Sequence, residues 1–220
     1  MKLTYLGHSA FEIETKGTKI LIDPFLVRVP AYKPNNISDI FVTHGHGDHL
    51  GSAINISKNN NATITATFEL ANYCASYGAK TNDVALGGWI NYKWGRVVLV
   101  PAIHGNSTPD GKYAGVPCGF VFEIEGKKIY YAGDTSLSSE MKVIGEIYKP
   151  DISILPIGGK YTMDIEHSII ASEWLGSKTI IPMHFDTFSA IAVDINDFIS
   201  GINAIGAKPV VLNIMDEFNL

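Results

Sequence analysis

Residues 44–49 read His-Gly-His-Gly-Asp-His, which places three histidines and one aspartate within six positions. Imidazole and carboxylate groups are the ligands that borderline divalent ions such as Zn²⁺ prefer in proteins. The alternative is a glycine-rich surface loop with scattered histidines, but so dense a cluster has little other physical rationale at neutral pH. The run therefore predicts a metal site, and the fold must bring the remaining ligands of that site to it.

The spacing within this run indicates two metal ions rather than one. Positions two apart in an extended segment project the same way, so His44 and His46 can hold one ion. The two intervening glycines let the backbone turn, so Asp48 and His49 can face a second ion beside the first. One ion could not readily take four ligands from six residues, so further ligands must come from elsewhere in the chain.

Apolar segments elsewhere end at or near residues of the same ligand types. Short apolar strands of this kind are expected over 39–43, 97–103, 128–131 and 179–183. The ligand-type residues that follow them are His44, His104, Asp134 and His184. Functional groups in layered α/β folds gather at one edge of the sheets. We therefore expect His104 to complete the first metal site, His184 the second, and Asp134 to bridge the two.

The rest of the chain changes from short strands to alternating strands and helices, which predicts an α/β protein. Further strands are expected over 2–6, 10–15, 19–22, 119–124, 152–157 and 209–214, and helices over 52–58, 68–77, 164–175 and 194–204. No linker, repeat or low-complexity tract separates them. We therefore expect a single domain over residues 1–220.

The composition is that of a globular protein, with 46% hydrophobic and 18% charged residues. The net charge of −5 includes no basic block, so a nucleic-acid partner is disfavoured. No apolar run approaches the ~18 residues of a membrane span, and the N-terminus lacks the order of a signal peptide, so a cytoplasmic location is expected. Cys74 and Cys118 lack metal-ligand spacing and are expected to be buried free thiols.

The metal-binding run, the strand-end His104, the Gly133-Asp134-Thr135 turn and the late His184 together resemble the metallo-β-lactamase superfamily. Four further segments resemble its branch of bacterial and archaeal metal-dependent hydrolases of unassigned substrate, related to ascorbate-6-phosphate lactonases: 5–9, 22–25, 161–163 and 181–185. The resemblance covers nearly the whole chain. It implies a four-layer αββα sandwich, with two mixed β-sheets flanked by helices. It also implies two divalent metal ions as cofactors, with zinc favoured and manganese or nickel as alternatives.

The resemblance also implies a role for each ligand. One metal would be held by His44, His46 and His104, the other by Asp48, His49 and His184, with Asp134 between them. Asp23 matches an acidic position that would orient a ligating histidine from behind, and an ordinary turn aspartate is an equal alternative. His8 lies in a turn that this branch places near the metals, where it would touch substrate or donate a proton unless it is a plain turn residue. His167 is expected to have a surface or capping role.

The predicted function is metal-dependent hydrolysis of a small ester or lactone, or of a small phosphodiester, by a metal-bound hydroxide. Asp48 would act as the base, and His184 or His8 would assist the leaving group. No Gly-x-Ser-x-Gly elbow offers a nucleophilic side chain. The alternative is a non-catalytic metal-binding regulatory module that keeps the fold. The expected partner is a small-molecule substrate, without a membrane, and a homo-oligomer is left open.

Overall fold

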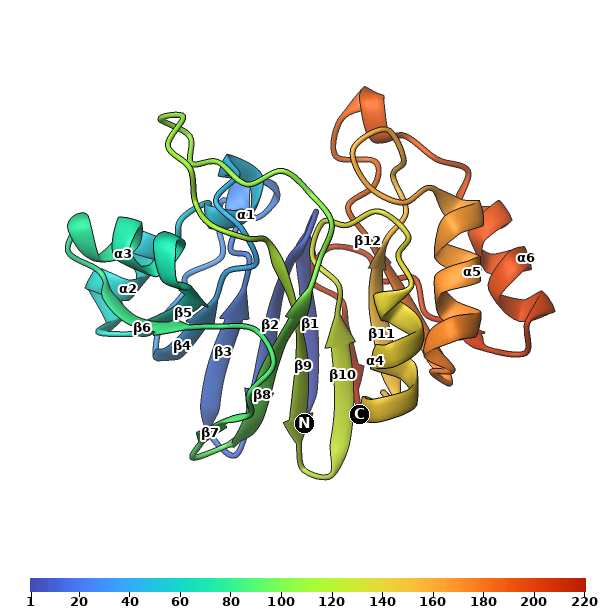
Figure 1. Ribbon diagram of the computed structural model, residues 1–220, viewed down its shortest axis with the longest axis horizontal. Coiled ribbons are helices and arrows are strands. Elements are labelled where there is room, and N and C mark those ends of the chain that lie inside the picture. Colours follow the sequence, from blue (N-terminus) through green and yellow to red (C-terminus); the bar gives the residue numbers. More distant parts are fainter. The chain divides into compact units, whose positions relative to one another are not determined.

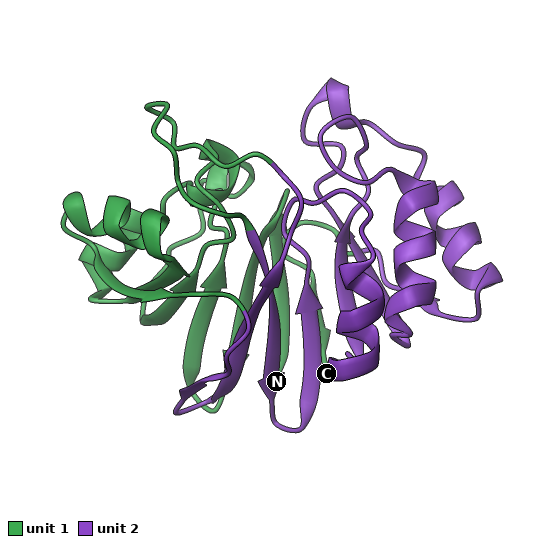
Figure 2. Ribbon diagram, viewed as in Figure 1, with its two compact units in different colours: residues 1–86, 105–117, 212–220 green, residues 87–104, 118–211 purple.

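The computed structural model describes residues 1–220, which divide into two compact units (Figure 2). Unit 1 comprises residues 1–86, 105–117 and 212–220, and unit 2 comprises residues 87–104 and 118–211. Each unit contains one seven-stranded sheet with helices packed on it (Figure 1). The single domain over residues 1–220 stays a prediction.

The sheet of unit 1 is mixed and has the strand order β14-β1-β2-β3-β4-β5-β6. Its strands are β1 (Lys2–Gly7), β2 (Ala10–Thr15), β3 (Thr18–Ile22), β4 (Ile37–Phe41), β5 (Thr63–Thr67), β6 (Lys80–Val84) and β14 (Glu217–Asn219). Its helices are the 3₁₀ turn η1 (Leu26–Arg28), α1 (Gly47–Leu50), α2 (Ala53–Asn60) and α3 (Phe68–Ser76). Helices α2 and α3 pack against β4, β5 and β6.

The core of unit 1 explains why this part of the chain folds as parallel strands joined by helices. Ile40, Val42 and Ile64 of the β4–β5 region are buried in the same cluster as Ala53 of α2 and Leu70 of α3. Strands covered in this way are enriched in apolar residues. Because β3 and β4 are parallel neighbours, the segments that follow them leave the sheet at the same edge.

The sheet of unit 2 is also mixed, with the order β13-β12-β11-β10-β9-β8-β7. Its strands are β7 (Ile90–Tyr92), β8 (Gly95–Pro101), β9 (Cys118–Ile124), β10 (Lys127–Tyr131), β11 (Ile152–Pro156), β12 (Thr179–Met183) and β13 (Lys208–Pro209). Its helices are α4 (Glu140–Tyr148), α5 (Ile165–Leu175), the 3₁₀ turn η2 (Ser189–Ile191) and α6 (Ile195–Ala204). Figure 1 shows α4, α5 and α6 packed in a row.

Strand directions bring three chain segments to one edge of the unit 2 sheet. Strands β8 and β10 are both antiparallel to β9, so they run the same way, and β10, β11 and β12 are parallel. The carboxyl ends of β8, β10 and β12 therefore share an edge. These ends lead to His104, Asp134 and His184.

Most expected elements are present within a few residues of their expected bounds, including the strands at 10–15 and 179–183. The expected strand over 209–214 is wrong. Only Lys208–Pro209 pairs with β12, because the chain then passes to unit 1, where Glu217–Asn219 pairs with β1. No helix is both long and apolar enough to span a bilayer.

Candidate metal centre

The first two histidines of the run lie close together at the edge of the unit 1 sheet. His44 follows β4, and His46 caps α1 with extended backbone angles, φ −58° and ψ 148°. His44 Nε2 and His46 Nδ1 are 3.0 Å apart. A tetrahedral ion with 2.0–2.1 Å bonds separates its ligand atoms by about 3.3 Å, so the two nitrogens are close to the spacing that one ion needs.

The backbone then turns, as the glycine spacing of the run predicts. The single helical turn of α1 carries Asp48 and His49, and the rings of His44 and His49 are 4.2 Å apart between centroids. Gly51 ends this turn at φ +43°, where a β-carbon would overlap the carbonyl of Pro24. Only glycine therefore lets α1 sit directly against the loop that follows β3.

Asp23 is fully buried and connects two of these histidines. Its Oδ2 atom is 2.7 Å from His49 Nδ1 and accepts a 2.7 Å hydrogen bond from the Thr43 hydroxyl. That hydroxyl is also 3.0 Å from His44 Nδ1, and the Thr43 amide donates to Asp23 Oδ1 at 2.8 Å. With both Nδ1 atoms engaged, Nε2 is the nitrogen that each ring would offer to a metal, which is the usual arrangement at metal-binding histidines.

His8 lies beside the same cluster in the tight turn between β1 and β2. Its backbone is left-handed, at φ +57°, and its side chain is buried. His8 Nε2 is 3.1 Å from Asp48 Oδ2, and its ring centroid is 5.9 Å from that of His49. The turn therefore lies beside the metal-binding run within unit 1, and the role of His8 near the metals stays a prediction.

In unit 2, the three other expected ligands come together around one carboxylate. Asp134 Oδ2 is 3.1 Å from His184 Nε2 and 3.6 Å from His104 Nε2. Asp134 and His184 are both only 3% exposed. The Thr135 hydroxyl accepts a 3.0 Å hydrogen bond from the amide of Ile103, so the turn carrying Asp134 is fastened to the segment that leads to His104.

The donor sets fit divalent metal ions. Unit 1 presents imidazoles with a carboxylate, and unit 2 presents two imidazoles around one carboxylate. Imidazole and carboxylate donors suit zinc, nickel and manganese.

The remaining candidates lie outside these clusters. His167 is exposed on the first turn of α5, where its backbone amide donates to the capping Asp164 side chain at 2.9 Å, and its surface or capping role stays a prediction. Both cysteines are buried and neither forms a disulfide, and burial raises the pKa of the Cys74 thiol to about 12. Thr43 and Asn106, which bond the metal-binding run, carry no ligand-type side chain and were missed from sequence.

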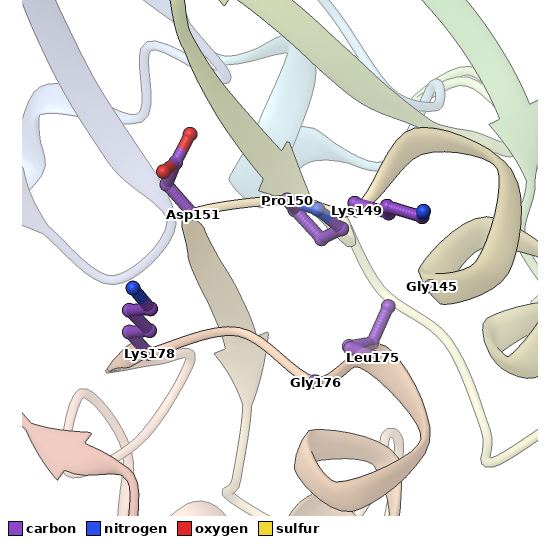
Figure 3. Close-up of a pocket in the computed structure, with 7 residues that line it drawn as sticks. All are labelled: Gly145, Lys149, Pro150, Asp151, Leu175, Gly176 and Lys178. Carbon is purple, nitrogen blue, oxygen red and sulfur yellow. The ribbon is translucent and has the colours of Figure 1, made fainter.

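A cavity of about 350 Å³ lies at the opposite edge of the unit 2 sheet (Figure 3). Asp151 and Lys178, which line it, directly precede β11 and β12, so it lies at the amino ends of these strands. The side chains of Lys149 and Lys178 point in different directions (Figure 3). This cavity is therefore remote from the Asp134 cluster and presents no convergent ligand set.

Two mixed seven-stranded sheets flanked by helices, with histidines and aspartates beyond their carboxyl ends, define a metallo-β-lactamase fold. The family described as "Beta-lactamase superfamily domain" matches residues 2–184, and the chain belongs to this family. The predicted family and fold class are thus confirmed.

Similar proteins carry names that agree with this assignment. The chain is 42% identical over 219 residues to a "UPF0173 metal-dependent hydrolase" of Carboxydothermus hydrogenoformans, covering 97% of both chains. It is 44% identical over 208 residues to a protein of the same name from Geobacillus thermodenitrificans, covering 91% of this chain and 92% of the relative. A solved structure, the metallo hydrolase Igni18 of Ignicoccus hospitalis, is 34% identical with a TM-score of 0.88, covering 100% of this chain and 98% of its own. These names support a hydrolase.

Proposed function

We propose that this chain is a metal-dependent hydrolase in which the two clusters form one dinuclear centre. One ion would be held by His44, His46 and His104 and the other by Asp48, His49 and His184, and Asp134 would be shared between them. The observation that carries the proposal is the position of Asp134. A single carboxylate oxygen lies 3.1 Å from His184 and 3.6 Å from His104, which are the histidines assigned to different ions.

Covalent continuity supports the assignment of His104 to the first ion. His104 is bonded to Gly105, and a β-carbon on Gly105 would lie 4.0 Å from His46 Cε1. Neighbouring Cα atoms across a trans peptide are about 3.8 Å apart. Within unit 1, Gly105 therefore lies beside His46, and this supports the proposed assignment of its covalent neighbour His104 to the first ion.

Divalent ions at such a centre lower the pKa of a coordinated water to about 7 and polarise the substrate oxygen. Side chains of the protein then transfer the proton of this water. Asp48 accepts it from the attacking water as the new carbon–oxygen bond forms. His8, 3.1 Å from Asp48, holds that carboxylate in place. His8 would deliver a proton to the leaving oxygen as the ester bond breaks, and His184 could do so only when it is not coordinated to the metal, so the reaction needs no other co-reactant.

A neutral ester or lactone fits the surroundings better than a phosphodiester. A hollow of about 520 Å³ in unit 2 includes Gly158, and a β-carbon there would overlap the His184 carbonyl, so one wall packs on the segment that holds His184. Four carboxylates line this hollow: Asp164, Glu166, Asp194 and Asp197. Like charges repel, so a neutral substrate would be favoured over an anionic one if the substrate extends into this hollow.

The test measures turnover and metal content together. Zinc- or manganese-loaded protein is assayed against lactones, aryl esters, thioesters and bis-p-nitrophenyl phosphate. We expect His46→Ala to lose both metal and hydrolysis, whereas His167→Ala, a matched change at the exposed histidine, retains both. Full activity of His46→Ala would refute the mechanism. Bound metal without turnover of any substrate class would instead favour the non-catalytic regulatory module.

A further inference from the structure

The side chain of Asn106 joins the metal-binding run to the loop formed by residues 105–117. Its Oδ1 atom accepts a 2.7 Å hydrogen bond from the amide of Gly45, and its Nδ2 atom donates at 2.8 Å to the carbonyl of Ala114. The Ala114 amide also donates to the Asn106 carbonyl at 3.3 Å. One side chain thus joins two backbone segments, at Gly45 and Ala114, that are about seventy residues apart in sequence.

The contact at Gly45 is too close for any other residue. A β-carbon there would lie 2.8 Å from Ala114 Cβ and 3.1 Å from the Ser107 carbonyl oxygen. Gly45 and Ala114 are both buried. Because the Gly45 peptide lies between His44 and His46, fixing its amide fixes the backbone from which both imidazoles project.

The loop that carries Asn106 is itself held firmly within unit 1. Ser107 and Tyr113 form a bridge across it. Between these two residues, Asp110 accepts a hydrogen bond from the Thr108 hydroxyl and lies 3.0 Å from Lys112 Nζ. These contacts lower the pKa of Asp110 to about 2. The Lys112 ammonium lies 5.4 Å from the centre of the Tyr73 ring on α3. The loop that carries Asn106 is therefore held in place by contacts within unit 1.

We propose that Asn106 is a positioning residue of the metal centre: its amide oxygen holds the Gly45 peptide so that His44 and His46 converge on one ion. The inference rests on the proposed function, because it assigns that ion to this pair. Removing a group that orients metal ligands typically lowers metal affinity 10–100-fold. We expect a loss of that size in Asn106→Ala, confined to one of the two metals.

The two hydrogen bonds of the Asn106 side chain can be tested separately. Asn106→Asp keeps an oxygen that accepts from the Gly45 amide but places its other oxygen against the Ala114 carbonyl, so it loses the bond within the loop and adds repulsion there. If the Gly45 bond is what matters, Asn106→Asp binds metal within about threefold of the wild type. If Asn106 only stabilises its own loop, both variants weaken metal binding alike.

Asn60 provides a matched control within the same unit. Its Oδ1 accepts from the Ile37 amide at 3.2 Å and its Nδ2 donates to the Ile56 carbonyl at 3.1 Å, the same bonding pattern at the amino end of β4. Asn60→Ala thus removes equivalent bonds at the opposite end of β4 from His44. We expect it to lower stability without changing metal affinity.

The experiment is competition of the full-length protein with a chromophoric chelator for zinc, with urea unfolding of each variant alongside. The binding phase that His46→Ala abolishes should weaken 10–100-fold in Asn106→Ala and remain unchanged in Asn60→Ala. Equal zinc affinity in Asn106→Ala and Asn60→Ala would overturn the inference while leaving the dinuclear centre intact. A wild type that binds no zinc would instead overturn the proposed function. Should Asn106→Ala fail to fold, a tenfold loss in folded Asn106→Asp would overturn the inference.

Discussion

Replacing Asp23 with Asn tests how the metal-binding histidines acquire their orientation. The change alters the chemistry of a fully buried side chain and almost none of its volume. Asp23 has a left-handed backbone, at φ +44°, which asparagine tolerates as well as aspartate does. Any effect on metal binding therefore comes from the hydrogen bonds rather than from backbone strain or a cavity.

The expected magnitude follows from which atoms can donate. A carboxylate only accepts, so Asp23 Oδ2, 2.7 Å from His49 Nδ1, keeps the ring proton on Nδ1 and presents Nε2 to the metal. In Asp23→Asn, the oxygen keeps the 2.8 Å bond from the Thr43 amide, which turns the NH₂ group toward His49. That NH₂ donates to Nδ1 and moves the ring proton to Nε2. We expect a 10–100-fold loss of metal affinity, about 1.4–2.7 kcal/mol.

The assay is zinc competition together with urea unfolding of the metal-free protein. We expect the free energy of unfolding to be about 1–2 kcal/mol lower than in the wild type, because charge-assisted hydrogen bonds become neutral ones. Asp151→Asn is the control, since Asp151 accepts from the Lys128 amide at 2.9 Å at the opposite edge of the unit 2 sheet. Asp23→Asn binding both metals with wild-type affinity would refute the reasoning.

Four further predictions concern the remaining parts of the site. Gly45→Ala should lower the free energy of unfolding by about 1–3 kcal/mol, because the added methyl would lie 2.8 Å from Ala114 Cβ; an unchanged urea midpoint would contradict this. Asparagine tolerates the left-handed turn at position 8, so His8→Asn should lower kcat by about 10²–10⁴-fold while metal content stays constant. A variant with wild-type kcat would show that His8 has no part in the mechanism. Chelation should lower the melting temperature, and zinc should restore it, because ligands that bind only the folded state stabilise it; equal melting temperatures would argue against bound metal. A thiol reagent at pH 8 should modify neither cysteine in folded protein and both in guanidinium, since burial raises the pKa of Cys74 to about 12, and rapid labelling of folded protein would show that the thiols are accessible.

Much of each cluster could be predicted from sequence because local spacing specifies it. The extended segment at His44 and His46, followed by a turn at Asp48 and His49, agrees with the spacing of the run, although Gly45 is needed for its close approach to Ala114 rather than for a special backbone angle. The shared edge of His104, Asp134 and His184 follows from apolar strands that end near ligand-type residues. The first feature depends on local pattern, which the sequence records directly, whereas the shared edge also depends on strand order and direction, which the structure shows.

The residues missed from sequence act through contacts between distant segments. Thr43 and Asn106 matter because of which backbone amides and side chains they reach, and nothing in their local sequence records this. The strand β6 was missed because it is a polar edge strand without apolar alternation. The wrong strand at 209–214 arose because its apolar residues are shared between two units.

The most direct test of the account is anomalous X-ray scattering at the metal absorption edge, measured on crystals of the metal-loaded protein. The account predicts two anomalous peaks per chain. One would be contacted by His44, His46 and His104, the other by Asp48, His49 and His184, with Asp134 reaching both. A single peak, or peaks that contact the unit 1 ligands without His104 and His184, would contradict the dinuclear centre.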